Sequence, residues 1–249
     1  MASYRYEREI DPADLAPEPQ RQYTRKERWK NWWDYNLKWV ILGVLAALTV
    51  FCFLGQATTG VKPDYNVAVV APGALPEDTI TALQTQLAQY GEDLNGDGKV
   101  TVTVNSYVID YSGDSVETSL SMANATKLAG DFSTGTSSVF LLYDPAGFEE
   151  NTSALRYLDG TLPELNSDDD WWDMVYRWTD CPVLTGLDLG EYAVDAGHTQ
   201  SGDSQELLSG FYVGIRGAWD DKTAEALQGS DAFWQALTAG AVSTVEAEG

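Results

Sequence analysis

The sequence predicts an α/β protein, in which a single transmembrane helix is followed by one exterior domain with a mostly parallel sheet and covering helices. Three observations predict this class. An uncharged, apolar run extends from Trp39 to Leu54. The remainder is strongly acidic, with 31 Asp/Glu and seven Lys/Arg from residue 61 onward. Within it, β-branched segments alternate with segments of helical periodicity, which is typical of a βαβαβ unit and a parallel sheet.

The apolar run predicts a transmembrane helix over residues 38–55. At ~1.5 Å per residue, its uncharged part forms a helix of about 24 Å, close to the thickness of a bilayer's hydrocarbon core. Basic residues crowd the side before the run, whereas Lys62 is the only basic residue in the forty that follow. The positive-inside rule therefore predicts a cytoplasmic tail over 1–37 and an extracytoplasmic domain over 63–243. The basic residues before the run are Arg21, Arg25, Lys26, Arg28, Lys30 and Lys38.

Aromatic residues cluster where the tail meets the run. Trp29, Trp32, Trp33 and Asn36 follow helical spacing, which predicts a short amphipathic helix lying on the inner leaflet before the chain turns into the membrane. A cleaved signal sequence is an alternative, since Gly55-Gln56-Ala57 resembles a small-residue cleavage site. A lipoprotein signal ending at Cys52 would place the bulky Phe51 before the cysteine, and residues 1–20 resemble a disordered tail.

The charge and the cysteines exclude several classes of protein. A net charge of −23 repels phosphate backbones and anionic lipid, so no nucleic-acid partner is expected. The same charge favours cations and basic partners, although it also serves solubility alone. Cys52 lies in the apolar run and Cys181 in the acidic domain, so an internal disulfide is not expected.

The exterior domain begins with three strands separated by two helices. The predicted strands cover 66–71, 100–109 and 139–143, and the predicted helices cover 74–91 and 114–129, with a loop over 130–138. The second half is less regular. It predicts a helix over 168–178, a returning strand within 210–217, and terminal helices over 221–227 and 231–239.

One sharp motif points to calcium. The stretch Asp93-Leu94-Asn95-Gly96-Asp97-Gly98-Lys99 fits the first seven positions of an EF-hand loop. Asp93, Asn95 and Asp97 would supply side-chain oxygens, Gly98 the turn, and Lys99 a backbone carbonyl. The stretch resembles the calcium loop of dockerin modules, which implies a structural Ca²⁺ site. Position 12 is Val104, so the remaining ligand would come from Glu92, Asp110, Asp114 or water; a metal-free turn is the alternative.

Other polar and aromatic groups carry weaker hypotheses. Residues 110–115 resemble the metal site of von Willebrand A domains, but favour an N-cap turn between a strand and a helix. The acids at 168–170 and Asp173 favour a capped helix over a cation site. Trp171, Trp172, Trp178 and Tyr176 favour core packing over a sugar-stacking platform. His198 is the only histidine, and no Gly-x-Ser-x-Gly, Ser-x-x-Lys, Gly-x-Gly-x-x-Gly or Walker motif occurs, so no catalytic residue is assigned.

The order of segments resembles extracellular solute-binding proteins of the periplasmic-binding type II class. The similarity is carried by Ala125–Phe132, Ser138–Asp144, Phe148, Leu158–Gly160, and Tyr212–Ile215 with the helix around Ala224. The resemblance implies a reduced member of that class, shortened relative to a two-lobe receptor.

Three functions remain open from the sequence. The first is a non-enzymatic binding or interaction domain, calcium-stabilised and anchored at a bacterial cell surface, with a protein or small-molecule ligand outside the cell. The second is a reduced solute-binding-like receptor or sensor, which predicts a cleft at the strand ends. The third is an anchored hydrolase that uses carboxylates, which needs two acids from different segments to converge in a cleft.

Overall fold

The computed structural model describes residues 23–59, 62–111, 118–164, 170–194 and 197–245. It contains two compact units, Met1–Val61 and Lys62–Gly249, and each is described by itself.

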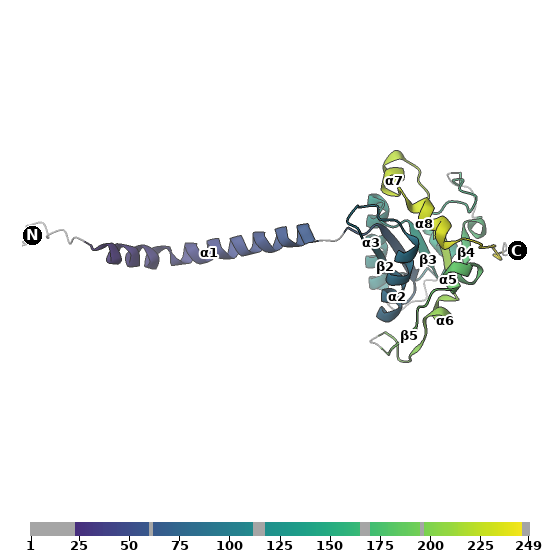
Figure 1. The fold of residues 1–249 in the computed structure, drawn as a ribbon, viewed down its shortest axis with the longest axis horizontal. Helices are drawn as coiled ribbons and strands as arrows, with labels where there is room; N and C mark the ends of the chain where they lie inside the picture. Colours follow the sequence, from purple (N-terminus) through teal and green to yellow (C-terminus); the bar gives the residue numbers. More distant parts are fainter. Residues whose placement is uncertain (1–22, 60–61, 112–117, 165–169, 195–196, 246–249) are drawn as a thin grey trace, which may run out of the picture. The chain divides into compact units, whose positions relative to one another are not determined.

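Helix α1 (Arg25–Thr59) is the regular element described in the first unit (Figure 1). A capping box starts it: the backbone N–H of Thr24 donates to Glu27 Oε2 at 2.9 Å, and the Glu27 N–H donates back to Thr24 Oγ1 at 3.4 Å. Its stretch Arg25–Phe51 is long and apolar enough to span a membrane. The expected separate amphipathic helix is continuous with it, because no proline or glycine interrupts residues 25–42.

Five strands form the central sheet of the second unit, in the order β2-β1-β3-β7-β4. Figure 1 labels β2, β3 and β4 of this sheet. The strands β1 (Tyr65–Ala71), β2 (Val102–Val108) and β3 (Val139–Leu142) are mutually parallel where they pair, as the βαβαβ pattern predicts. The strand β7 (Tyr212–Ile215) runs antiparallel to β3, and β4 (Val175–Arg177) antiparallel to β7. The sheet is therefore mixed, with a parallel half and an antiparallel half.

Both faces of the sheet are buried. Along β1, Val67 and Val69 enter one hydrophobic core, whereas Ala68 and Val70 enter the other. This alternation follows from the two-residue period of a strand, and burial on both faces explains why the strand reads as a continuous apolar run.

Helices cover the two faces. Helices α2 (Glu77–Leu87) and α8 (Ser230–Leu237) contribute Leu83 and Phe233 to the first core. Helices α3 (Thr118–Thr134) and α4 (Pro145–Thr152) contribute Leu128 and Phe148 to the second. The remaining short elements are η1 (Ala88–Tyr90), η2 (Trp171–Asp173), η3 (Trp178–Asp180), α5 (Pro182–Thr185), α6 (Ser204–Leu208), α7 (Asp221–Ala226), and the β5 (Glu191–Tyr192) and β6 (Gly202–Asp203) pair.

Two predicted elements were wrong in part. The loop expected over 130–138 begins only at Gly135, whose φ of 66° ends α3, because a single glycine such as Gly130 does not stop a helix. The helix expected over 168–178 is absent from its described part. Val175 instead pairs with Gly214 of β7, between the 3-10 turns η2 and η3, so strand pairing overrides the local helical spacing.

Candidate functional site

At the carboxyl edge of the sheet, the connections that follow two neighbouring strands diverge toward opposite faces; we call this place the diverging point. β1 lies between β2 and β3, and the chain leaves β1 toward α2 on one face but leaves β3 toward α4 on the other. In open α/β sheets, ligands bind where successive connections separate in this way.

A pocket of about 460 Å³ lies at that edge. This volume is within the range of small-molecule sites. Residues following three parallel strands meet there with residues from the antiparallel half. Its lining is Val70 and Ala71 at the end of β1, with Pro72 after it; Ile109, Asp110 and Tyr111 after β2; Tyr143, Asp144, Pro145 and Ala146 after β3; and Trp171 and Tyr212.

Asp144 and Tyr111 are held together at the start of α4. Asp144 Oδ1 accepts the backbone N–H of Gly147 at 2.9 Å, which caps the helix, and Pro145 occupies the first turn. A Cβ at Gly147 would lie 2.5 Å from Asp144 Oδ2 and 2.6 Å from Tyr111 Cβ, so only glycine fits. Burial raises the pKa of Tyr111 to about 12, and the Asp144 carboxylate adds to this shift. Tyr111 is therefore a neutral phenol at neutral pH.

Aromatic rings supply much of the remaining lining. The ring of Trp171 meets that of Tyr212 edge to face, with centroids 6.1 Å apart. The Arg177 guanidinium lies 5.6 Å from the centroid of Tyr212, so that ring already contacts a cation. Tyr143 is 54% exposed and packs edge to face on Phe211 at 5.8 Å. Among the described residues, no lysine or arginine belongs to the pocket lining.

The predicted calcium loop forms a tight turn before β2. Its carboxylates and amide bind backbone N–H groups: Asp93 accepts from Gly96 at 2.7 Å and Gly98 at 2.8 Å, and Asp97 accepts from Lys99 at 2.9 Å. Asn95 Oδ1 accepts the Asp97 N–H at 2.9 Å. Within the described ranges, no three His, Cys, Asp or Glu side chains are grouped so as to hold a metal ion. The calcium site stays a prediction.

Asp64 lies outside the calcium-loop motif but binds the backbone of the loop. Its carboxylate accepts the backbone N–H groups of Leu94, Asn95 and Thr101 at 2.9, 3.0 and 2.7 Å. Partial burial raises the pKa of Asp64, but these hydrogen bonds outweigh it and leave the pKa below its usual value. Asp64 precedes β1, thirty residues from the motif, so only the pairing of β1 with β2 brings them together.

The residues considered for the remaining calcium ligand lie at different distances from the loop. Asp110 lies beyond the carboxyl end of β2 while the loop precedes its amino end, about 20 Å away at ~3.3 Å per residue, so Asp110 is excluded. Val104 is buried in the core. Glu92 is exposed beside the loop, and Asp114 lies outside the described residues.

The structure also places most of the residues that carried the weaker hypotheses. Trp178 is 1% exposed in the first core, and Tyr176 packs against that core, as expected. Trp171 packs against the second core and also lines the pocket. His198 lies edge to face with Tyr192 in the region of the β5–β6 pair. Cys181 is a buried free thiol. The acids at 168 and 169 lie outside the described residues, as does most of the stretch likened to von Willebrand A domains.

No protein-family model, no curated protein and no solved structure matches this chain. The solute-binding resemblance is therefore still a prediction. Sequence reasoning named Asp110 and Trp171 for other roles and missed Tyr111, Tyr143, Asp144 and Tyr212 as one site. The available signal was positional: Tyr143 and Asp144 directly follow the apolar strand β3, Tyr111 lies three residues after β2, and Tyr212 begins the returning strand.

Proposed function

We propose that this chain is a membrane-anchored, extracytoplasmic binding protein that captures a small organic cation in the carboxyl-edge pocket. Of the three hypotheses from the sequence, the receptor or sensor required a cleft at the strand ends. The observation that carries the proposal is the pocket at the diverging point of the strands, with its aromatic and acidic lining.

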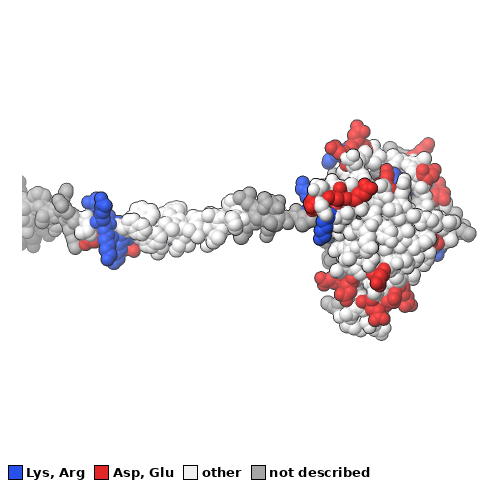
Figure 2. Space-filling view, in the orientation of Figure 1, with Lys and Arg blue, Asp and Glu red and all other residues white. Residues whose placement is uncertain are grey.

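The anchor is supported by α1. Its apolar side chains, among them Leu42, Leu45 and Leu48, are exposed along the helix, and such a surface is stable in lipid rather than in water. Basic side chains gather toward its amino-terminal end (Figure 2). Protease treatment of intact and permeabilised cells tests the orientation, since an extracytoplasmic domain is cleaved in both.

The cationic ligand class follows from charge and ring chemistry. Asp110 and Asp144 place carboxyl groups in the lining. Acidic side chains form several clusters on the visible face of the domain, where few basic ones appear (Figure 2). Tyr111, Tyr143 and Trp171 add π-faces, which attract ammonium groups. Because Arg177 already lies over Tyr212, the ligand's charge is expected to contact the other rings.

Choline and its neutral isostere 3,3-dimethylbutan-1-ol provide a direct test. The two have the same shape, so the full chain in detergent should bind choline about tenfold more tightly, as a cation–π contact predicts. Saturation-transfer NMR measures both. Asp110→Asn should weaken choline binding, whereas Asp188→Asn, at an exposed acid elsewhere in the domain, should not. If both compounds bind equally, or if neither binds, the proposal of a cationic ligand is refuted.

An anchored hydrolase is the second candidate. It is favoured by Asp110 and Asp144, which reach the pocket from different strands. Chromogenic glycosides test it: hydrolysis lost in both Asp110→Asn and Asp144→Asn would support catalysis. Activity that survives both variants would exclude these carboxyls from the reaction.

Structural calcium in the loop is a separate proposal. It rests on the match of Asp93, Asn95, Asp97 and the Lys99 carbonyl to an EF-hand loop. Millimolar calcium should raise the melting temperature of the full chain but not that of a variant combining Asp93→Ala and Asp97→Ala. An unchanged melting temperature in the parent chain would leave the loop as a metal-free turn held by Asp64.

A further inference from the structure

A second, smaller cavity lies at the opposite edge of the sheet from the pocket. It has a volume of about 110 Å³ and lies between Ser138, which precedes β3, and Arg216, which follows β7. Arg156 and Asp231 line it from other segments, together with apolar side chains that include Leu227. We call it the Arg216 cavity.

Unpartnered polar atoms converge on this cavity. In the part of the chain that the structure describes, five buried side-chain nitrogen or oxygen atoms lack a hydrogen-bond partner. Four of them belong to its lining: Ser138 Oγ, Arg156 Nε, and Arg216 Nε and Nη1. Ser138 is only 3% exposed and Arg216 only 7%. Buried polar groups without partners are rare in native proteins, so four around one cavity indicate a missing partner.

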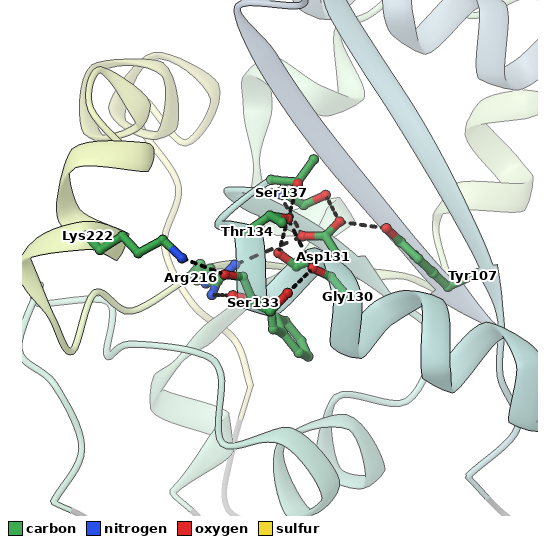
Figure 3. Close-up of polar contacts among 10 residues, drawn as sticks. Tyr107, Gly130, Asp131, Ser133, Thr134, Ser137, Arg216 and Lys222 are labelled. Carbon is green, nitrogen blue, oxygen red and sulfur yellow. Dashed lines mark hydrogen bonds and ion pairs between the residues drawn. The ribbon is translucent and has the colours of Figure 1, made fainter.

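The Arg216 guanidinium is held from its other side. Its Nη2 donates to the backbone carbonyl of Phe132 at 2.6 Å, in the last turn of α3 (Figure 3). Lys222 Nζ donates to the neighbouring carbonyl of Ser133 at 3.2 Å. These two cations satisfy carbonyls at the negative end of the helix. The guanidinium is therefore fixed in place before any ligand arrives.

The nearby carboxylates do not satisfy the free donors. Asp131 Oδ1 is 4.0 Å from Arg216 Nη1, beyond hydrogen-bond distance. Its two oxygens already accept from Tyr107 Oη at 2.6 Å and from the Ser137 N–H at 2.8 Å (Figure 3). Asp231 pairs with Nη2 of Arg156, which leaves Arg156 Nε without a partner. Asp220 also acts electrostatically on Arg216.

Guanidinium groups donate and never accept, so the missing partner must present acceptors. We propose that the Arg216 cavity binds a small oxyanion, either a carboxylate or a phosphate group, through Arg216, Arg156 and Ser138. The volume suits one such group, since it corresponds to roughly three or four water molecules at about 30 Å³ each. The charge-assisted bonds to two arginines favour the oxyanion over water.

Melting temperatures of the full chain in detergent test the proposal, in sodium acetate, phosphate or chloride at equal ionic strength. An oxyanion at a hundredfold excess over its dissociation constant should raise the melting temperature by roughly 5–11 °C. Ser138→Ala should abolish the rise while retaining the backbone bonds of that residue. Thr101→Val is the matched control, because Thr101 Oγ1 is the other buried orphan and is not part of this cavity. Arg156→Gln, which leaves the α3 end intact, should also abolish the rise.

The change in melting temperature in each salt identifies the ligand class or overturns the proposal. A rise with acetate alone identifies a carboxylate ligand, and a rise with phosphate alone identifies a phosphate, provided that Thr101→Val keeps the rise and Ser138→Ala loses it. The proposal is overturned by an equal rise in melting temperature with chloride, by a rise that persists in Ser138→Ala, or by no rise in any salt. The cavity would then hold water. None of these results depends on the ligand of the carboxyl-edge pocket.

Discussion

Replacing Tyr107 with Phe removes one hydroxyl from the buried cluster at the end of α3. That hydroxyl donates to Asp131 Oδ2 at 2.6 Å, and the two side chains are 3% and 5% exposed. A buried hydrogen bond to a charged group contributes about 1.5–3 kcal/mol. Since Asp131 keeps the two hydrogen bonds from Ser137, at 2.8 and 2.6 Å, we expect a loss of about 2 kcal/mol in the free energy of unfolding.

The assay is urea unfolding of the full chain in detergent, followed by near-ultraviolet circular dichroism. For a domain of this size, a loss of about 2 kcal/mol corresponds to a melting temperature lower by roughly 4–8 °C. Burial and the Asp131 carboxylate both raise the pKa of Tyr107. The hydroxyl therefore stays neutral in the native state, so the difference should be constant below about pH 10, where unfolded tyrosine ionises, and should shrink above it.

Tyr65→Phe is the matched control. Tyr65 is also a buried strand tyrosine, at 2% exposure, but its hydroxyl accepts the neutral backbone N–H of Glu92 at 3.1 Å. A neutral hydrogen bond contributes about 1 kcal/mol. If Tyr107→Phe costs no more than Tyr65→Phe, the cluster around Asp131 does not carry the stability assigned to it here.

Three further predictions follow from single positions. Gly147→Ala should weaken choline binding and lower the melting temperature, because its Cβ would collide with Asp144 and Tyr111; calorimetry and thermal unfolding check both effects. Burial raises the pKa of the Cys181 thiol to about 12, with a smaller contribution from a neighbouring carboxylate. The chain should therefore lose up to about 1.4 kcal/mol of stability per pH unit between about pH 9 and 12, relative to Cys181→Ala, in urea titrations. Asp64→Asn should cost about 1–2 kcal/mol at pH 7, and the difference should diminish below about pH 4, where the carboxylate protonates.

The parallel half of the fold was readable from the sequence for a local reason. The runs at 66–71 and 139–143 are apolar on both sides of the strand, which a sheet covered on two faces requires. In the antiparallel half, the returning strand predicted within 210–217 is confirmed as β7, but β4 was not readable. β4 is three residues long, and its pairing with β7 joins segments far apart in the chain. Its sequence keeps a helical spacing that long-range pairing overrides.

The sites were less predictable than the fold because their residues meet only through topology. Asp93, Asn95 and Asp97 were found by a contiguous motif, but Asp64, which binds the same loop, has no such signal. The Arg216 cavity likewise combines residues 138, 156 and 216. Only a fold that places the start of β3 beside the end of β7 brings them together.

The antiparallel direction of β7 is what gives the domain two chemically opposite edges. Tyr212 begins the strand beside Leu142, at the edge of the aromatic and acidic pocket. Four residues later, after about 14 Å at ~3.4 Å per residue, Arg216 leaves the strand at the edge of the Arg216 cavity. A one-residue slip of β7 against β3 would turn every side chain of the strand to the other face. It would remove Tyr212 from one site and Arg216 from the other in a single step, so the two sites share one structural requirement although the ligands proposed for them have opposite charges.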